Sequence, residues 1–303
     1  MPQTSENRFV ARPLFAHAAI RDSMYSVPML SRPLVTVVTP SYNYARYLGA
    51  CLASVRAQSY PHIQHIIRDA CSTDGSAEVV ASFQGTYNMI PRFEKDGGAA
   101  DALNRGFAEA QGDVFCWLNA DDYWMHEHVV DQAVASLANG ADVVTAGGWL
   151  VNVDGTRIQR IPAVQNRVDR ELRYSDGILQ PATFWRRSFH RPLRADLHYT
   201  FDWALWLDMQ RAGARFRVRD EDWAAYRWHS INKTATDPAN RRAEIALILA
   251  ESCGSRSPQA LWARTVARGY TVAERRRMPR LKRAVAQANR IMCRLTRRRI
   301  FSC

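Results

Sequence analysis

Two adjacent carboxylates directly follow a short, strongly apolar segment of the chain. The segment spans residues 114–118, and Asn119-Ala120-Asp121-Asp122 comes straight after it. Adjacent unpaired carboxylates repel each other, and partial burial raises their pKa values. A divalent cation relieves this repulsion, and oxygen ligands of this kind suit Mg²⁺ or Mn²⁺ together with substrate phosphates. The alternative is that Asp121 or Asp122 caps a following helix, so the pattern alone leaves both interpretations open.

Polar residues also follow three earlier segments that are rich in apolar residues. These segments span residues 34–39, 63–68 and 89–94. The residues that come after them are Pro40-Ser41-Tyr42-Asn43, Asp69 and Lys95-Asp96-Gly97-Gly98. In open α/β sheets, ligands bind beyond the carboxyl ends of the strands. If the apolar segments are parallel strands, these polar clusters lie together at one edge of the sheet.

The elements that would position these residues alternate between strand and helix patterns. A fifth strand is expected from residue 142 to 145. Helical spacing of apolar residues predicts helices over 47–57, 99–110 and 127–138, and a polar turn at 72–75 opens one that ends near Phe83. Such alternation favours an α/β fold, with a mostly parallel sheet flanked by helices.

The second half of the chain is less regular. The patterns predict a hairpin over 151–160, a helix over 201–212, strands over 215–219 and 223–228, and a helix over 240–251 followed by two basic helical stretches. We therefore divide the chain into an N-terminal arm (1–32), a main domain (33–235) and a basic helical C-terminal extension (236–303). The main domain is expected to have a nucleotide-binding half, 33–145, and an acceptor half, 146–235.

The motifs at the four strand ends occur in a recognisable order. They read Pro40-Ser41-Tyr42-Asn43, Asp69-Ala70-Cys71-Ser72-Thr73-Asp74-Gly75, Asp96-Gly97-Gly98 with Asn104, and Asn119-Ala120-Asp121-Asp122. This arrangement resembles the family 2 glycosyltransferases, which are inverting enzymes of the GT-A (Rossmann-like) fold. The resemblance covers residues 33–235. It departs from the family at Asn119, where an aspartate is usual, and at Ala70-Cys71, where related members have two glycines.

The resemblance implies donor-binding and metal-binding roles for particular residues. Those expected to bind the nucleotide or the sugar donor are Pro40, Ser41, Tyr42, Asn43, Asp69, Asp96, Asn104, Asn119, Ala120 and Asp121. Asp121 is the expected ligand of Mn²⁺ or Mg²⁺, with His229 as a second ligand. A lone histidine is more often structural, and that alternative stays open for His229.

The resemblance also implies a catalytic base and an acceptor side. Asp202 opens a predicted helix and matches the family's catalytic aspartate, which takes the proton from the acceptor hydroxyl. The alternative is that Asp202 is the N-cap of that helix. Gln180 and Trp203 are expected to line the acceptor side, although the stretch around Gln180 could equally be an ordinary loop.

The positive charge of the protein is concentrated at its C-terminus. Residues 255–303 contain 14 Lys and Arg but one acid, Glu274, whereas the first 254 residues carry 27 bases and 28 acids. A nearly neutral main domain argues against a nucleic-acid-binding face. Apolar residues recur at helical spacing among the basic ones at Leu281, Ala284, Val285, Ala288 and Ile291. This predicts peripheral contact of 279–301 with an anionic membrane surface, or alternatively a helix docked on the main domain.

The resemblance to family 2 implies a glycosyltransferase that moves a single sugar from a nucleotide-diphosphate sugar, by default a UDP-sugar. The implied acceptor is a glycan or a lipid-linked glycan in bacterial surface polysaccharide or lipopolysaccharide synthesis. The six cysteines form no CxxC pair, and the chain has neither an apolar signal core nor a membrane-spanning segment. We therefore expect a cytoplasmic protein, peripheral at the inner face of the membrane. The alternatives are a nucleotidyltransferase, or a non-enzymatic membrane or nucleic-acid binder that acts through the tail.

Overall fold

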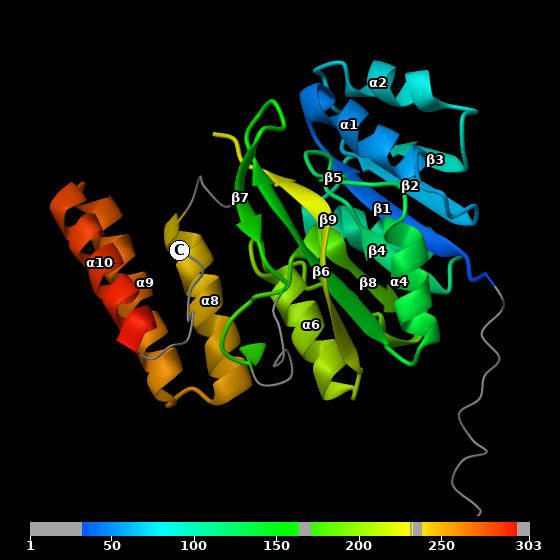
Figure 1. Ribbon diagram of the computed structural model, residues 1–303. Coiled ribbons are helices and arrows are strands. Elements are labelled where there is room, and N and C mark those ends of the chain that lie inside the picture. The colour runs from blue at the N-terminus through cyan, green and yellow to red at the C-terminus, as the bar shows by residue number, and fades with distance from the viewer. Residues whose placement is uncertain (1–31, 164–170, 231, 233–237, 296–303) are drawn as a thin grey trace, which may run out of the picture. The chain divides into compact units, whose positions relative to one another are not determined.

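The computed structural model describes residues 32–163, 171–230, 232 and 238–295, and these residues form one compact unit. Figure 1 follows the chain through this unit. The predicted N-terminal arm, apart from Arg32, lies outside the described residues, as do residues 296–301 of the predicted membrane-contacting segment.

The first half of the unit is a parallel sheet, as the alternating pattern predicted. Its strands are β1 (Val35–Ser41), β2 (Ile63–Asp69), β3 (Met89–Phe93) and β4 (Val114–Trp117), in the order β3-β2-β1-β4. The connecting helices are α1 (Ala45–Arg56), α2 (Ser76–Phe83) and α3 (Ala99–Glu109), and α4 (Val129–Ala138) follows the segment 118–128 after β4.

Helices cover both faces of this parallel sheet because successive side chains of a strand point to opposite faces. Thr39 of β1 contacts Cys51 of α1 at 3.8 Å on one face. Its neighbour Val38 points to the other face, where Gly106 of α3 packs against it so closely that a β-carbon at position 106 would lie 2.4 Å from the valine side chain. Only glycine allows α3 to approach β1 at this point.

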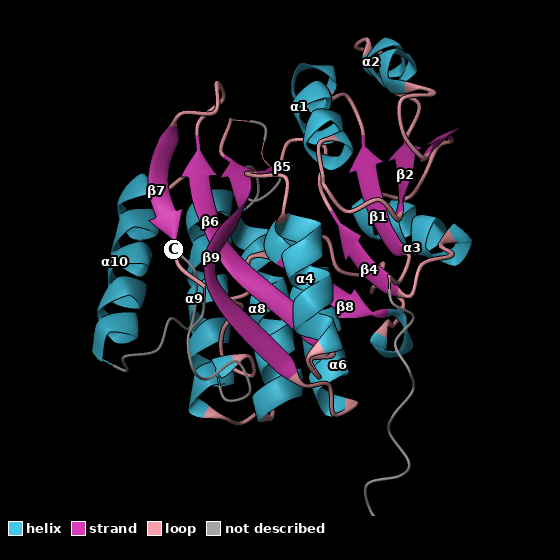
Figure 2. Ribbon diagram, turned by 45° about the vertical axis from the view of Figure 1, so that its right-hand side comes forward, coloured by secondary structure: helices cyan, strands magenta, loops and turns pink. Residues whose placement is uncertain are grey.

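The second half turns the sheet into a mixed one. It adds β5 (Tyr123–Trp124), β6 (Val143–Val151), β7 (Arg157–Ile161), β8 (Thr183–Arg186) and β9 (Phe216–Arg227). The described residues thus form one nine-stranded sheet in the order β3-β2-β1-β4-β8-β6-β9-β5, with β7 paired to β6. Strand β8 is antiparallel to both of its neighbours, β4 and β6. Figure 2 shows the strands of the two halves side by side.

Two local predictions differ from the structure. The segment around Gln180 is not only a loop, because a short 3₁₀ helix, η1 (Gln180–Ala182), leads into β8. The two strands predicted over 215–219 and 223–228 are a single strand, β9, whose pairing with β6 changes register between Ala146 and Gly148. A bulge of this kind interrupts the alternation of side chains, which is why the sequence resembles two strands.

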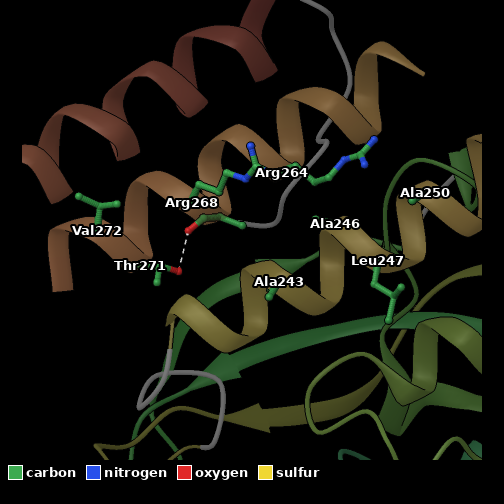
Figure 3. Close-up of a pocket in the computed structure, with 9 residues that line it drawn as sticks. Ala243, Ala246, Leu247, Ala250, Arg264, Arg268, Thr271 and Val272 are labelled. Carbon is green, nitrogen blue, oxygen red and sulfur yellow. Dashed lines mark hydrogen bonds between the residues drawn. The ribbon is translucent and has the colours of Figure 1, made fainter. Parts of the chain in front are cut away.

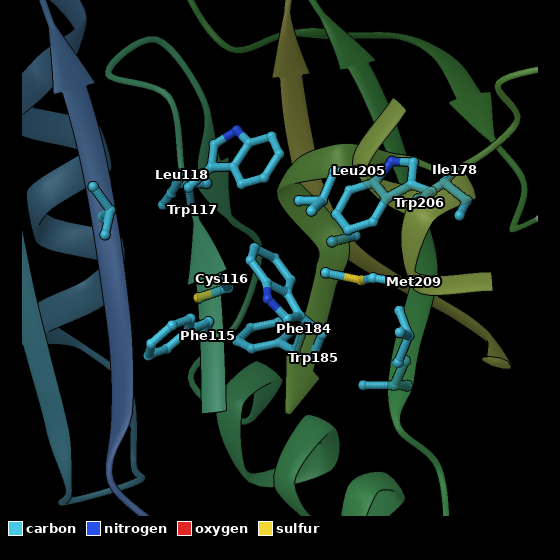
Figure 4. Close-up of a cluster of buried hydrophobic side chains, with 14 of the residues drawn as sticks. Phe115, Cys116, Trp117, Leu118, Ile178, Phe184, Trp185, Leu205, Trp206 and Met209 are labelled. Atoms are coloured by element: carbon cyan, nitrogen blue, oxygen red, sulfur yellow. The ribbon is translucent and has the colours of Figure 1, made fainter. Parts of the chain in front are cut away.

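Large aromatic side chains fill the space between the centre of the sheet and helix α6 (Phe201–Arg211). The ring of Trp206 stacks on that of Trp117, with centroids 5.7 Å apart, and meets Trp185 of β8 edge-on at 5.5 Å. Figure 4 shows this cluster beside β4 and α6. Because such rings bury much apolar surface, they hold the start of α6 in a fixed position against β4. A second short helix, η2 (Arg187–Phe189), follows β8.

The C-terminal extension consists of α8 (Pro238–Cys253), α9 (Pro258–Arg275) and α10 (Pro279–Leu295). Helix α8 belongs to the main core, because Ile245, Ile248 and Leu249 are buried in it. Helix α10 packs on α9, where Trp262 donates a hydrogen bond to Asn289 at 3.0 Å. In the part of the chain that the structure describes, no helix is long and apolar enough to cross a membrane.

Candidate active site

The loops after β1 and β2 are joined by a chain of hydrogen bonds. Asp69, which is buried at the end of β2, accepts bonds from the backbone N–H of Ser72 at 2.7 Å and from its hydroxyl at 2.8 Å. The same hydroxyl oxygen accepts the N–H of Asn43 at 2.7 Å, and the Asn43 side chain accepts the N–H of Thr73 at 2.9 Å. Asp69 therefore fixes the shape of both loops.

This joined pair of loops requires unusual backbone conformations. Asn43 has φ = 58° and Cys71 has φ = 62°, in the left-handed region that favours glycine. Cys71 occupies a position where related members have glycine, and it adopts the conformation that glycine would adopt without strain. Cys71 therefore adopts a glycine-like conformation at a cost of about 1–2 kcal/mol.

Asp74 is a residue of this site to which the sequence analysis assigned no role. Its carboxylate accepts the N–H of Ala45 at the start of α1 at 2.9 Å and the hydroxyl of Ser76 at 2.6 Å. Burial raises the pKa of Asp74, but the bonds from Ser76 and Ala45 outweigh it and hold that pKa below its ordinary value. The spacing of Asp69, Ser72 and Asp74 was a usable signal, since short polar side chains at this spacing commonly bond nearby backbone N–H groups.

The structure brings together the two residues that were predicted to bind a metal. His229 Nε2 lies 2.9 Å from Asp121 Oδ2, and the two side chains are only 2% and 12% exposed. The Tyr47 ring stacks on the His229 ring with centroids 4.8 Å apart, and Asn232 Nδ2 lies 3.4 Å from the same Asp121 oxygen. The other ring nitrogen of His229, Nδ1, is buried without a hydrogen-bond partner among the described residues.

Asp122 has a structural position next to this pair. One of its carboxylate oxygens accepts the N–H of Arg227 at 3.0 Å, and the other accepts the side-chain amide of Asn119 at 3.2 Å. Burial, and after it the charge of Asp121, raise the pKa of Asp122 well above its ordinary value. Asp122 is buried and thus held inside the turn by these bonds.

Asn119 and Gln180 form one hydrogen-bonded unit. The amide of Asn119 donates to Gln180 Oε1 at 3.1 Å, and Gln180 Nε2 donates to the carbonyl of Trp117 at 2.7 Å. Gln180 is buried. In this arrangement, the side chain that was expected on the acceptor side orients the residue at the first position of the acidic motif.

Arg227 is a further residue that the sequence analysis did not single out. Its Nε donates to the carbonyl of Asp121 at 2.9 Å, and its Nη1 donates to the carbonyls of Asn152 at 3.2 Å and Val153 at 2.9 Å. Its guanidinium lies over the Tyr47 ring, 5.1 Å from the centroid. Arg227 therefore ties the acidic turn to the hairpin between β6 and β7. A charged residue inside the otherwise apolar run 223–228 was the available signal.

Asp202 lies in the first turn of α6, and Thr200, not Asp202, is the N-cap residue of that helix. The carboxylate of Asp202 is half-buried and accepts the N–H of Trp203 at 2.8 Å. Burial raises the pKa of Asp202 to about 6. A second carboxyl, that of Asp176, lies within electrostatic range, and its Oδ1 is buried without a partner among the residues described. The two groups titrate as an interacting pair.

Other residues of the predicted set are engaged in structural contacts. The indole of Trp203 is buried and donates to the carbonyl of Leu172 at 2.6 Å. The amide of Asn104 both donates to and accepts from the backbone of Leu193, at 2.8 and 2.7 Å. Asp96 accepts the N–H of Gly98 at 2.8 Å, before α3.

The remaining predicted donor residues lie at the ends of β1 and β4. Tyr42 projects into solvent and is 59% exposed, whereas the Ser41 hydroxyl is buried without a partner in the described part of the chain. Pro40 is half-buried within β1, and Ala120 is buried next to Asp121. Tyr42 is therefore the exposed side chain of this group.

A groove of about 570 Å³ lies away from these residues, between α8 and α9. Small apolar side chains and two arginines, Arg264 and Arg268, line it (Figure 3). None of the predicted site residues contributes to the groove, so it is separate from the strand ends.

The fold matches that of GT-A glycosyltransferases. The family model described as "Glycosyl transferase family 2" matches residues 36–193, just over half of the chain. The chain belongs to this family. This confirms the predicted fold class and enzyme class, and it decides against the nucleotidyltransferase and the non-enzymatic alternatives.

Bacterial glycosyltransferases are among the relatives. TuaG of Bacillus subtilis (strain 168), named for teichuronic acid biosynthesis, is 26% identical over 217 residues, which cover 67% of this chain and 86% of TuaG. An uncharacterized glycosyltransferase of Mycobacterium tuberculosis (strain ATCC 25618 / H37Rv) is 38% identical over 136 residues, 43% of this chain and 51% of that protein. The chain thus spans most of TuaG but about half of the mycobacterial relative.

Solved structures share the fold at low sequence identity. S. aureus TarS residues 1–349, in complex with UDP-GlcNAc, has a TM-score of 0.58 and 17% identity, over 77% of this chain and 72% of that one. The mannosyltransferase PcManGT from Pyrobaculum calidifontis, in complex with GDP-Man and Mn²⁺, has a TM-score of 0.57 and 18% identity, over 80% and 76% of the two chains. At this identity the similarity establishes the fold.

Proposed function

We propose that the protein is an inverting, metal-dependent glycosyltransferase that moves one sugar from a UDP-sugar to an acceptor hydroxyl. The observation that carries this proposal is the contact between Asp121 and His229 at the end of β4, next to the loops that Asp69 holds together. Two distant segments of the chain meet there, and ligands of α/β sheets bind at this edge.

The chemistry of Asp121 and His229 suits a divalent cation. A carboxylate oxygen and an imidazole nitrogen are both ligands of Mn²⁺, and Mg²⁺ and Mn²⁺ sites are commonly completed by substrate phosphates. Among the described residues, no group of three or more His, Cys, Asp and Glu side chains could hold a metal by itself. We infer that Asp121 Oδ2 and His229 Nε2 supply two ligands and that the donor diphosphate supplies others. When bound, the metal neutralises the charge that grows on the departing diphosphate.

Asp202 is the proposed general base. It takes the proton from the acceptor hydroxyl while the hydroxyl oxygen attacks the anomeric carbon, and the bond from that carbon to the diphosphate breaks on the opposite face. The configuration of the anomeric carbon therefore inverts. A base that works near neutral pH needs a pKa not far below the operating pH, and burial brings the pKa of Asp202 to about 6.

UDP is the proposed donor nucleotide, with GDP and dTDP as alternatives. TarS is complexed with UDP-GlcNAc and PcManGT with GDP-Man, so the shared fold accommodates more than one base. Asp69 was expected to bind the nucleotide or the sugar donor, but both of its oxygens accept bonds from Ser72. We therefore propose that Asp69 acts on the nucleotide by shaping the loops, and that Tyr42 and Asn43 contact the nucleoside.

The proposed acceptor is a glycan or lipid-linked glycan of bacterial surface polysaccharide or lipopolysaccharide synthesis, reached from the cytoplasm at the inner face of the membrane. The name of TuaG supports a cell-surface glycan. Ala284, Ala288 and Ile291 are exposed on α10, and so is Arg283, which supports contact of 279–301 with an anionic membrane. Arg264 and Arg268 in the groove of Figure 3 add positive charge to this extension. No nucleic-acid partner is proposed.

The proposal is tested by incubating the protein with UDP-, GDP- and dTDP-sugars, Mn²⁺ and detergent-solubilised bacterial lipid-linked glycans. Wild type is expected to release one nucleoside diphosphate in an acceptor-dependent reaction, and NMR of the product should show the inverted anomer. Asp202→Asn should abolish transfer, whereas Asp208→Asn, on the same helix and paired on the surface with Arg211, should not. Retention of configuration, or full transfer by Asp202→Asn, would contradict the proposal.

A further inference from the structure

Helix α8 of the C-terminal extension reaches the segment that leads into α6. Glu244 Oε1 accepts the backbone N–H of His198 at 2.7 Å. Its Oε2 accepts the N–H groups of Tyr199 at 2.8 Å and Thr200 at 3.1 Å, and the Thr200 hydroxyl at 3.1 Å. One carboxylate, 44 to 46 residues distant in sequence, thus satisfies three consecutive N–H groups.

We propose that Glu244 is a positioning residue for catalysis, which holds the first turn of α6, and with it Asp202, in the geometry that proton transfer requires. Thr200 is the N-cap residue of α6, and its side chain makes no capping bond to the helix. Helix starts normally use such a side chain to satisfy their first N–H groups. Here the Thr200 hydroxyl donates to Glu244 instead, so the position of the helix start is set from α8.

The rest of α8 anchors this contact. Ile245, Ile248 and Leu249 are buried in the main core, so Glu244 is carried on a helix that is itself fixed. The hydrogen bonds to a charged acceptor are of the stronger kind. Asp202 follows Thr200 by two residues, and a small displacement of a catalytic group can cost up to about 100-fold in rate.

The charges around Asp202 come from two packed segments. Asp176, from the segment before η1, faces it, and so do Arg241 and Glu244 from α8. Glu244 also bonds the segment that starts α6. Its negative charge raises the pKa of Asp202, after the larger contribution from burial, so a neutral residue at 244 lowers that pKa.

The test compares Glu244→Ala and Glu244→Gln with Glu251→Gln in the full chain. Glu251 is a matched control, because it lies on the same helix and its carboxylate bonds Arg194 on the surface at 2.7 Å. Glutamine keeps an acceptor oxygen but loses the charge, so it should retain the fold and rescue part of the rate. Steady-state rates, Mn²⁺-dependent UDP binding and the pH profile of kcat/KM are measured for each variant.

For Glu244→Ala we expect kcat to fall about tenfold or more, with UDP binding unchanged, and for Glu244→Gln a smaller fall. In Glu244→Gln the acidic limb of the pH profile should move to lower pH, and in Glu251→Gln it should stay in place. Loss of stability alone would move neither the limb nor kcat per folded molecule. If both Glu244 variants match Glu251→Gln in rate and pH profile, the inference is wrong.

This inference rests on the proposed function, and the two fail differently. If Asp202→Asn transfers sugar at the wild-type rate, Asp202 is not the base and both proposals fall. If Asp202→Asn is inactive while the Glu244 variants behave like the control, the inference about Glu244 alone is overturned.

Discussion

The half-buried carboxylate of Asp202 should give the enzyme an unusual dependence on pH. Burial raises the pKa of Asp202 to about 6, from its ordinary value of 3.8. A general base must be ionised to accept a proton, so kcat/KM should rise as pH increases through this value. With a pKa of about 6, roughly one-tenth of the molecules are ionised at pH 5 and nine-tenths at pH 7. The expected change in kcat/KM between these two pH values is therefore about tenfold.

An ordinary aspartate predicts a different profile. Its carboxylate is ionised in more than about 90% of molecules at pH 5, so kcat/KM would hardly change between pH 5 and 7. The assay is release of nucleoside diphosphate over pH 5 to 8, at donor concentrations well below KM. Binding of UDP with Mn²⁺ is measured over the same range, so that a change at Asp121 and His229 is separated from one at Asp202. A flat kcat/KM above pH 5, with unchanged UDP binding, would refute the reasoning.

The raised pKa of Asp202 also makes the stability of the protein depend on pH, and this dependence serves as a control. A raised pKa in the folded state favours the protonated form, so the stabilising contribution of Asp202 is present below pH 3.8 and is lost as pH rises through about 6. At pH 7 the ionised carboxylate therefore opposes folding, by up to about 3 kcal/mol. Asp202→Asn should be at least as stable as wild type at pH 7 in urea denaturation. Its loss of activity then cannot come from unfolding.

Three further predictions concern residues that shape the site. Ser72→Ala removes the hydroxyl between Asp69 and Asn43. We therefore expect a loss of about 1–2 kcal/mol in stability and weaker UDP binding by calorimetry. Wild-type affinity for UDP would show that the joined loops do not contribute to nucleotide binding. Arg227→Met removes the donor that bonds the carbonyls of Asp121 and of the β6–β7 hairpin. Urea denaturation should show that the free energy of unfolding falls by about 2–4 kcal/mol. A fall of less than about 0.5 kcal/mol would contradict this. Asn119→Asp restores the usual acid, but it places a second carboxylate beside Asp122, to which the Asn119 amide now donates at 3.2 Å. The variant should therefore be less stable than wild type and should bind Mn²⁺ with UDP no more tightly. A clear gain in affinity would show that Asn119 is a weakened metal ligand.

The first half of the fold could be predicted from the sequence because each element there is specified locally. A run such as 34–39 is buried on both faces by helices, so its apolar character is continuous, and β1 covers Val35–Ser41. Strand β8 could not be found in this way. It has only four residues, follows Pro181, and is a strand because β4 and β6 lie on either side of it.

The contacts within the candidate site likewise depend on segments that are distant in the sequence. The pairing of Asp121 with His229 was predicted from family resemblance, and nothing in the local sequence gives the 2.9 Å contact between residues that are 108 apart. Trp203 and Gln180 were assigned to the acceptor side, yet their polar atoms bond Leu172 and Trp117 inside the protein. Burial of a polar side chain depends on which segments pack around it, and sequence spacing does not report that.

The packing of the basic extension could not be predicted from the sequence either. Its helical spacing was visible in the sequence, but the division of its surface between protein and solvent was not. Val285 contacts α9 at Gly269, whereas Ala284 and Ile291 are exposed. The predicted alternative was a helix docked on the main domain, whereas the described contacts of α10 are with α9 of the extension. Contact with a membrane stays a prediction.

The central claim, a metal-linked nucleotide site at Asp121 and His229, is tested most directly by isothermal titration calorimetry of UDP. Wild type, Asp121→Asn, His229→Ala and the control Asp208→Asn are each titrated with and without Mn²⁺, and GDP and dTDP are titrated into wild type. We predict that one nucleotide binds tightly to wild type and to Asp208→Asn only when Mn²⁺ is present, and that both site variants lose this metal-dependent part. Equal binding with and without Mn²⁺, or unchanged metal-dependent binding in Asp121→Asn and His229→Ala, would contradict the account.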